Sequence, residues 1–154
     1  MALTSTYTYN MAASPKASHI GLNVLTWDFN SGAAKLGSIS DVLTLGKIPN
    51  GALITDIDLN MGISLAAATS YNLVLLAVDA QGTYSAITTL IGSVTANAST
   101  VQAFSKRTPY KLSLSDDRAV QYAVLALNCI VGVSGTVSTS LQGNVKFLTD
   151  GTPS

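Results

Sequence analysis

The stretch DVLTLGKIPNGALITDIDLNMGI, residues 41–63, decides the fold of this chain. Its first part is rich in apolar, β-competent side chains: Val42, Leu43, Leu45 and Ile48. The next residues, Pro49-Asn50-Gly51, suit a tight turn, because Pro presets φ and both Asn and Gly tolerate positive φ. The stretch therefore predicts strand, turn, strand, which we interpret as a central hairpin.

Two sets of side chains alternate after this turn. One face carries a mainly apolar set: Leu53, Thr55, Ile57, Leu59 and Met61. The other face carries a mainly polar set: Ile54, Asp56, Asp58 and Asn60. Alternation of this kind is typical of a half-buried strand. It predicts a sheet whose apolar face packs on a second layer.

Composition points to one β-rich domain with a weakly charged surface. The chain has 154 residues, a formal net charge of zero and 10% charged residues, against about 25% in an ordinary soluble domain. All eight acids are Asp, so Glu, a good helix former, is missing. The neutral charge does not favour nucleic acid or anionic membrane as a partner. With 47% hydrophobic residues, such a surface favours association with other protein copies or partners.

The chain is expected to divide into an N-terminal arm (1–19), a β-sandwich domain (20–150) and a C-terminal tail (151–154). The arm is polar and lacks a sustained apolar period, so it is either a frayed terminus or a segment ordered by a neighbouring subunit. Aromatic residues are enriched at interfaces, which favours the second interpretation. The candidate interface residues are Tyr7, Tyr9, Met11, Pro15 and His19.

Further strands are expected along the sandwich domain. Residues 20–29 predict a strand with a bulge or bend near Val24 and Leu25, and residues 71–78 predict a central strand covered on both faces. Residues 119–131 and 136–148 predict a closing hairpin around the turn 132–135. Eight or nine strands at this spacing predict an all-β, antiparallel two-sheet β-sandwich or jelly roll. The expected core comprises Leu53, Ile57, Leu59, Leu73, Leu75, Val124, Leu125, Leu127, Val145 and Phe147.

No constellation of residues predicts catalysis or a cofactor. His19 is the only histidine and Cys129 the only cysteine, which leaves no zinc site, and no nucleophile elbow accompanies the histidine. Asp56 and Asp58 share one face of a strand, yet the spacing of a calcium loop is missing, so solvated acids are the better interpretation. Lys106-Arg107 is too small a basic cluster for a nucleic-acid footprint. We expect a protein without enzymatic activity, metal or cofactor.

The sequence resembles one family of structural proteins, on three segments. These are Gly21-Leu22-Asn23-Val24, then Ser40-Asp41-Val42-Leu43-Thr44-Leu45, then Lys47-Ile48-Pro49-Asn50-Gly51-Ala52-Leu53-Ile54. In this order they resemble the capsid decoration (cement) proteins of tailed-bacteriophage heads, in which a short strand leads to Lys-Ile-Pro-x-Gly-Ala and an alternating strand. The chain departs from many of these proteins at residues 79–84, where an acidic, Gly-rich centre is replaced.

The resemblance implies a β-sandwich or jelly roll that binds the outer surface of a phage capsid and stabilises the shell. It also implies the major capsid protein as a partner, a homotrimer, synthesis in the host cytoplasm and a final location in the virion. It brings no catalytic residues. The alternative is a glycan- or receptor-binding β-sandwich of a phage tail or adhesin, which should expose Trp or Tyr near loop acids; Trp27 and Tyr84 are the candidates.

Overall fold

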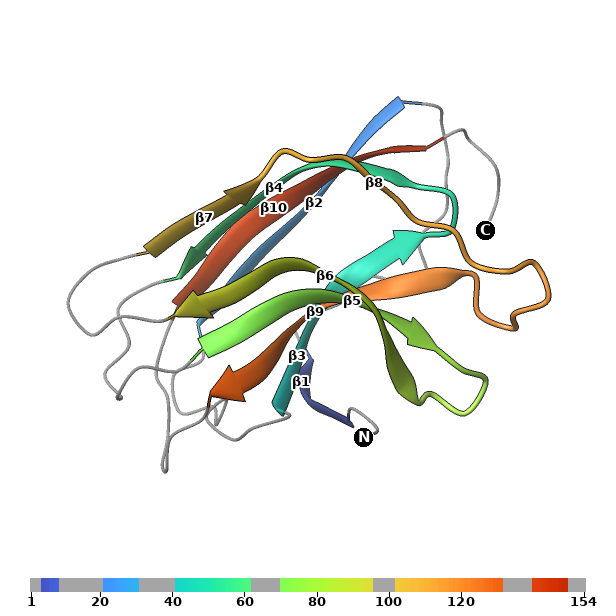
Figure 1. Cartoon of the computed structure of the whole chain (residues 1–154), viewed down its shortest axis with the longest axis horizontal. Coiled ribbons are helices and arrows are strands. Elements are labelled where there is room, and N and C mark those ends of the chain that lie inside the picture. The colour runs from blue at the N-terminus through green and yellow to red at the C-terminus, as the bar shows by residue number, and fades with distance from the viewer. Residues whose placement is uncertain are drawn as a thin grey trace.

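The computed structural model describes residues 4–8, 21–30, 41–61, 70–95, 102–131 and 140–149. These residues contain strands, turns and extended segments but no helix. The strands form two sheets that face each other across a shared core (Figure 1). The predicted all-β, two-sheet sandwich is confirmed.

The first sheet, here the β3 sheet, has the order β1-β3-β9-β5-β6. Its strands are β1 (Thr4–Thr8), β3 (Asp41–Pro49), β9 (Tyr122–Val131), β5 (Ser70–Val78) and β6 (Tyr84–Thr95). β1 pairs with β3 in parallel, and the other neighbours are antiparallel.

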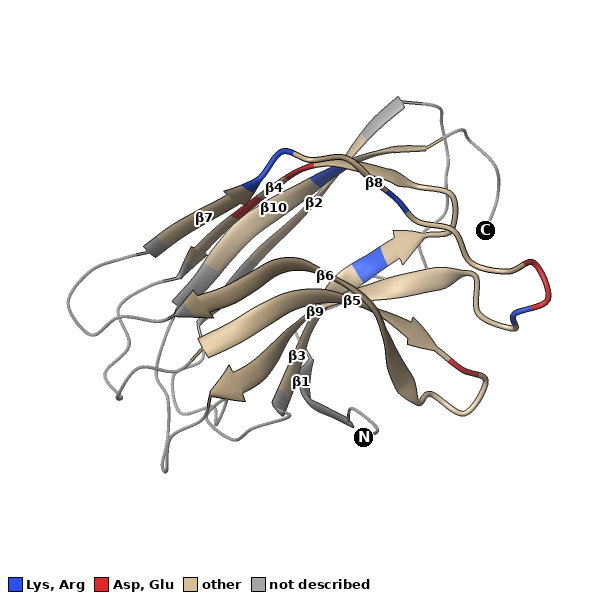
Figure 2. Ribbon diagram, in the orientation of Figure 1, with Lys and Arg blue, Asp and Glu red and all other residues tan. Residues whose placement is uncertain are grey.

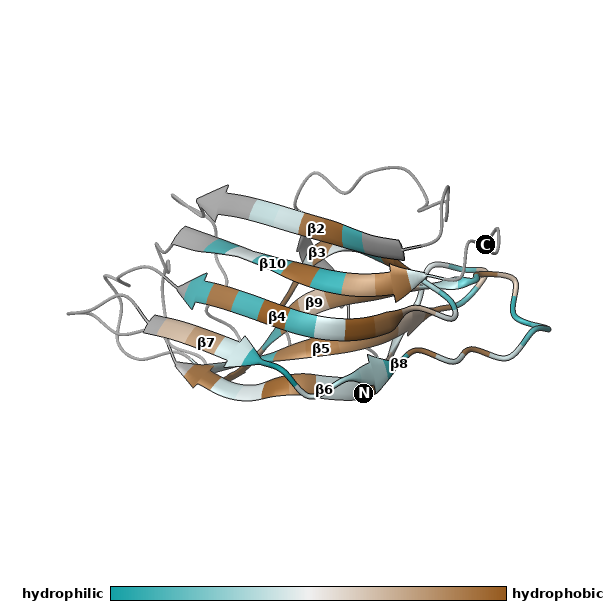
Figure 3. Cartoon of the chain, turned by 90° about the horizontal axis from the view of Figure 1, so that it is seen from above, coloured by the Kyte–Doolittle hydropathy of each residue, from teal (hydrophilic) through white to brown (hydrophobic). Residues whose placement is uncertain are grey.

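The second sheet, here the β4 sheet, has the order β2-β10-β4-β7 and is antiparallel throughout (Figure 3). Its strands are β2 (Gly21–Asn30), β10 (Ser140–Thr149), β4 (Leu53–Met61) and β7 (Gln102–Lys106), and β8 (Tyr110–Lys111) also pairs with β4. Sheets of order β2-β10-β4-β7 and β3-β9-β5-β6 are the two halves of a jelly roll. Of the two predicted alternatives, a β-sandwich of another type or a jelly roll, the structure is therefore the jelly roll.

The core between the sheets is built from the inward-facing residues of both layers. Nine of the ten expected core residues are buried, Leu53 being the exception. Val124 belongs to a second apolar cluster, with Val42, Val74, Leu76, Val78 and Ala126, on the other face of the β3 sheet. β5 contributes to both clusters, as expected for a central strand covered on both faces.

A β-bulge in β4 explains why the Leu53 prediction is wrong. The pairing with β10 passes from Lys146 opposite Asp56 to Phe147 opposite Ile54, which leaves Thr55 as an extra residue. One extra residue reverses the side-chain alternation. Ile54 therefore enters the core at 1% exposure, while Leu53 lies half-buried opposite the exposed Leu148. On the C-terminal side of the bulge the predicted buried face is confirmed, since Ile57 and Leu59 are buried.

The two predicted hairpins, one at residues 41–63 and one at residues 119–148, do not form. β3 and β4 belong to different sheets, and so do β9 and β10. The turn at Pro49-Asn50-Gly51 does form, with Gly51 at φ +87°, but it carries the chain from one layer to the other. A side-chain pattern specifies which face of a strand is buried, and the same pattern suits a neighbour in the same sheet or in the facing one.

Two further local expectations can be compared with the structure. β2 has no bulge at Val24 and Leu25, because its ten residues pair in unbroken register with β10. β5 and β6 form a true hairpin, in which Asp79 Oδ1 accepts hydrogen bonds from the backbone N–H groups of Gln81 and Thr83. In the described part of the chain, no helix is long and apolar enough to cross a membrane.

Candidate interaction surfaces

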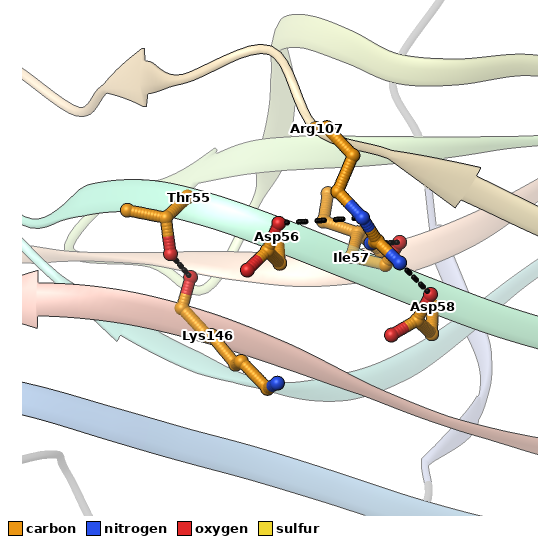
Figure 4. A network of polar contacts seen from close by, with 6 residues as sticks. All are labelled: Thr55, Asp56, Ile57, Asp58, Arg107 and Lys146. Carbon is orange, nitrogen blue, oxygen red and sulfur yellow. Dashed lines mark hydrogen bonds and ion pairs between the residues drawn. The ribbon is translucent and has the colours of Figure 1, made fainter.

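The outer face of the β4 sheet carries a small charge network. Arg107, which follows β7, reaches over β4 between Asp56 and Asp58 (Figure 4). Its Nε lies 3.5 Å from Asp56 Oδ1, its Nη2 donates to Asp58 Oδ1 at 3.0 Å and its Nη1 donates to the Ile57 carbonyl at 3.3 Å. One guanidinium thus offsets the repulsion between two neighbouring carboxylates.

This arrangement fits a surface tie between strands better than a reactive centre. The guanidinium side chain is 59% exposed and the carboxylates 35% and 36%, so water screens the ion pairs strongly. Within the described residues, no group of three or more His, Cys, Asp or Glu side chains is placed to hold a metal ion. Thr55, the bulged residue, donates its hydroxyl to the Lys146 carbonyl at 3.3 Å and so joins β4 to β10 (Figure 4).

Beyond this network the described strands carry few charges (Figure 2). The outer face of the β4 sheet instead exposes apolar side chains next to the polar ones, at Val24 (52%) and Leu148 (39%). Leu148 pairs with Leu53 on one side and with Leu22 on the other. Two lysines also lie here, since Lys146 pairs with Val24 and Lys111 pairs with Leu53. This end of the sheet is therefore a partly apolar surface with two basic residues.

Asn50 ties the crossover turn to the opposite loop. Its Nδ2 donates to the Leu114 carbonyl at 3.2 Å and to Gln121 Oε1 at 2.8 Å, while its Oδ1 accepts from the Leu114 N–H at 2.8 Å. Its own N–H donates to the Gln121 carbonyl at 3.0 Å, and the Gly51 N–H donates to the Leu112 carbonyl at 3.0 Å. The motif that carries the family resemblance thus has a structural role: it locks the passage between the two sheets.

A group of aromatic and basic side chains lies at the same end of the β3 sheet. Lys47 Nζ lies 4.8 Å from the centroid of the Tyr122 ring, a cation–π contact. Tyr84 is partly buried against the outer apolar cluster, as is Tyr122. Burial, with a smaller contribution from Tyr122, raises the pKa of the Tyr84 hydroxyl above its usual value of 10.0.

The residues expected at an interface are largely beyond what the structure describes. Tyr7 lies in β1, where its backbone is in register with Leu43 of β3 in the same chain. Tyr9, Met11, Pro15 and His19 lie outside the described residues. Part of the expected arm is thus an edge strand of the sandwich, and the interface role of its side chains stays a prediction.

The alternative of a glycan-binding module loses one of its two aromatic candidates. Trp27 is 3% exposed and packs in the core between the sheets, where its ring lies against Gly143. Tyr84 is partly covered by the outer apolar cluster. The indole of Trp27 therefore cannot serve as a stacking platform for a sugar ring.

Comparison with known proteins adds a fold relationship. No protein-family model matches the chain, and no curated protein matches it. Among solved structures, a chain in the capsid of Ralstonia phage GP4 is similar over 90% of this chain and 91% of its own, with a TM-score of 0.61 at 11% identity. At this identity the likeness shows a shared fold alone. This chain has a fold that also occurs in a phage capsid.

Two other solved structures are more remote. A chain of infectious bursal disease virus (Gt strain) matches 83% of this chain and 32% of its own, with a TM-score of 0.48 at 14% identity. The CBM22-1 xylan-binding domain from Paenibacillus barcinonensis Xyn10C matches 89% of this chain and 97% of its own, with a TM-score of 0.47 at 9% identity. At these scores neither likeness bears on function.

The two features that sequence reasoning missed are both polar and both structural. The Asn50 network has a signal in the sequence, an Asn inside a Pro-x-Gly turn, but its partners lie 64 and 71 residues away. Arg107 is likewise 49 residues from Asp58. Such contacts become visible once the order of the strands is known.

Proposed function

We propose that this protein is a non-enzymatic virion component that binds the outer surface of a phage capsid and stabilises the shell. The observation that carries the proposal is the jelly-roll fold, which is similar over nine tenths of both chains to a chain in a phage capsid. The weakly charged surface supports the same role, because it does not oppose close packing of copies on a shell.

In this proposal the partners are the major capsid protein and further copies of the chain, arranged as a homotrimer. Repetition on a shell multiplies weak contacts, so no single contact has to be strong. The N-terminal arm provides part of the attachment, with Tyr7, Tyr9, Met11, Pro15 and His19 as its contact residues. β1 keeps one end of this arm on the sandwich, next to β3.

The test is co-sedimentation of the purified protein with phage shells that lack it, together with the melting temperature of those shells. Binding that raises the shell's melting temperature supports the proposal, and absence of binding at every salt concentration contradicts it. Light scattering of the free protein tests the trimer, and a monomer of 15.9 kDa would contradict that part unless the shell is needed for assembly.

The attachment residues need a separate variant, because deleting the arm would also remove β1 and its pairing with β3. Replacing Tyr7 and Tyr9 together by Ser keeps the backbone of this strand and removes the aromatic anchors. We expect weaker co-sedimentation with an unchanged melting temperature of the free protein. Asn60→Ala, at an exposed position of β4, is the matched control.

A further inference from the structure

The free edge of β2 differs from the other sheet edges of the described chain. β1 and β7 are five residues long, and β7 ends at Lys106 and is followed by Arg107. β6 is longer, but its pairing with β5 shifts register in three places, and Ser93 has a φ of +55°. Short strands, charges and bulges are the devices by which proteins prevent edges from pairing with other chains.

β2 has only one of these devices, a single charged residue. It is ten residues long and pairs with β10 in unbroken register, and no described strand pairs with its other side (Figure 3). Asp28 is its only charged residue. Its outer row of backbone N–H and C=O groups is therefore a regular template for one more strand.

The side chains that flank this edge are also incompletely covered. Val24 points to the outer face and is 52% exposed, which makes it the most exposed large apolar side chain of the described residues. Leu25 points inward, against Gly46 of the facing sheet, and is partly buried on the core cluster. An added strand would cover the first and complete the burial of the second.

We propose that a second copy of this chain occupies this edge, through antiparallel pairing of β2 with β2 about a two-fold axis near Val24. Asp28 decides the direction. An in-register parallel partner would set the two Asp28 residues opposite each other, whereas antiparallel pairing centred on Val24 separates them by about eight residues, roughly 27 Å at about 3.4 Å per residue. This pairing would extend the antiparallel β4 sheet across two molecules, and both molecules would use the same surface, the edge of β2.

This inference rests on the edge itself and not on the proposed function, because two copies can pair in solution or on a shell. The first test is the mass of the full-length protein by sedimentation velocity, over a series of concentrations. We expect two-fold association, of single chains or of trimers, whose dissociation constant rises on the order of tenfold or more in Val24→Lys, since the substitution adds like charges across the axis. Val131→Lys is the matched control, at a valine that is 51% exposed on β9, an internal strand.

The second test uses cysteines at Val24 and Thr26, singly and mixed, under mild oxidation. Opposed Cα atoms in an antiparallel pair lie about 4.5–5.5 Å apart, which suits a disulfide. A covalent dimer from Val24→Cys alone, or from a mixture of Val24→Cys and Thr26→Cys, supports the pairing and gives its register. A wild-type monomer at every concentration, equal effects of the two lysine substitutions, or no cross-link in any combination would overturn it. Shell binding that survives Val24→Lys would leave the proposed function intact.

Discussion

Asn50→Ala should lower the free energy of unfolding mainly through lost hydrogen bonds, and only to a small extent through lost packing of the Asn50 side chain. The side chain makes three hydrogen bonds to the loop that follows β8: two from Nδ2, to the Leu114 carbonyl and Gln121 Oε1, and one accepted by Oδ1 from the Leu114 N–H. Alanine removes all three and leaves their partners in place. Because Leu114 is buried, its N–H and C=O lose their partners where little water can replace them.

The magnitude follows from those stranded groups. Leaving a buried donor or acceptor unsatisfied costs about 1–3 kcal/mol. Gln121 is half-buried and is expected to recover part of its loss from water, so we count mainly the two backbone groups of Leu114. We expect the free energy of unfolding to fall by about 2–4 kcal/mol. A double-mutant cycle with Gln121→Ala should show a coupling of about 0.5–3 kcal/mol, the range for residues in one hydrogen-bond network.

The assay is urea unfolding followed by the fluorescence of Trp27, the single tryptophan, which is buried at 3% exposure. Protein concentration is held fixed, because self-association would add to the apparent stability. Asn60→Ala is the control: the same truncation at an exposed position of β4, expected to stay within about 0.5 kcal/mol of wild type. If Asn50→Ala also stays within that limit, the turn does not depend on this network and the reasoning is wrong.

Three further predictions use the same unfolding assay. Gly143→Ala should cost about 1–3 kcal/mol, because the new methyl group would meet the only tryptophan ring and a backbone carbonyl of β4; Gly92→Ala, with no atom closer than 3.7 Å, should not. Asp58→Asn should cost less than about 1 kcal/mol and less still in high salt, since its ion pair with Arg107 is half-exposed; a larger loss would show a stronger tie. The raised pKa of Tyr84 means that the unfolded chain ionises first, so stability should fall as pH rises above about 10, and Tyr84→Phe should flatten that fall.

Side-chain periodicity predicts the buried faces of this protein well. Ile57 and Leu59 follow the alternation seen in the sequence, and Val145 and Phe147 do the same in β10. Burial of apolar surface is the main driving force of folding, so a strand can hardly place such a face in water. The error at Leu53 has a physical cause, since one bulged residue at Thr55 reverses the alternation without any sign in the sequence.

Periodicity does not specify which strands become neighbours. β9 and β10 each have an apolar face and are joined by a short connection, which is also what a hairpin requires. In the jelly roll they lie in opposite sheets, so that their apolar faces meet across the core instead of side by side. The choice depends on long-range pairing with β3, β5, β2 and β4, and a local pattern contains no information on those partners.

The same limit applies to the surfaces through which this chain could assemble. Aromatic residues in the arm can be recognised from sequence, because their chemistry alone suits an interface. The β2 edge cannot, since a strand becomes an edge only when its neighbours are known. Residues 21–30 have the alternation of an ordinary strand, and only their place beside β10 makes them the margin of the β4 sheet among the described strands. In a jelly roll the order of the strands therefore determines the edges, and an edge is where a further strand can be added to a sheet.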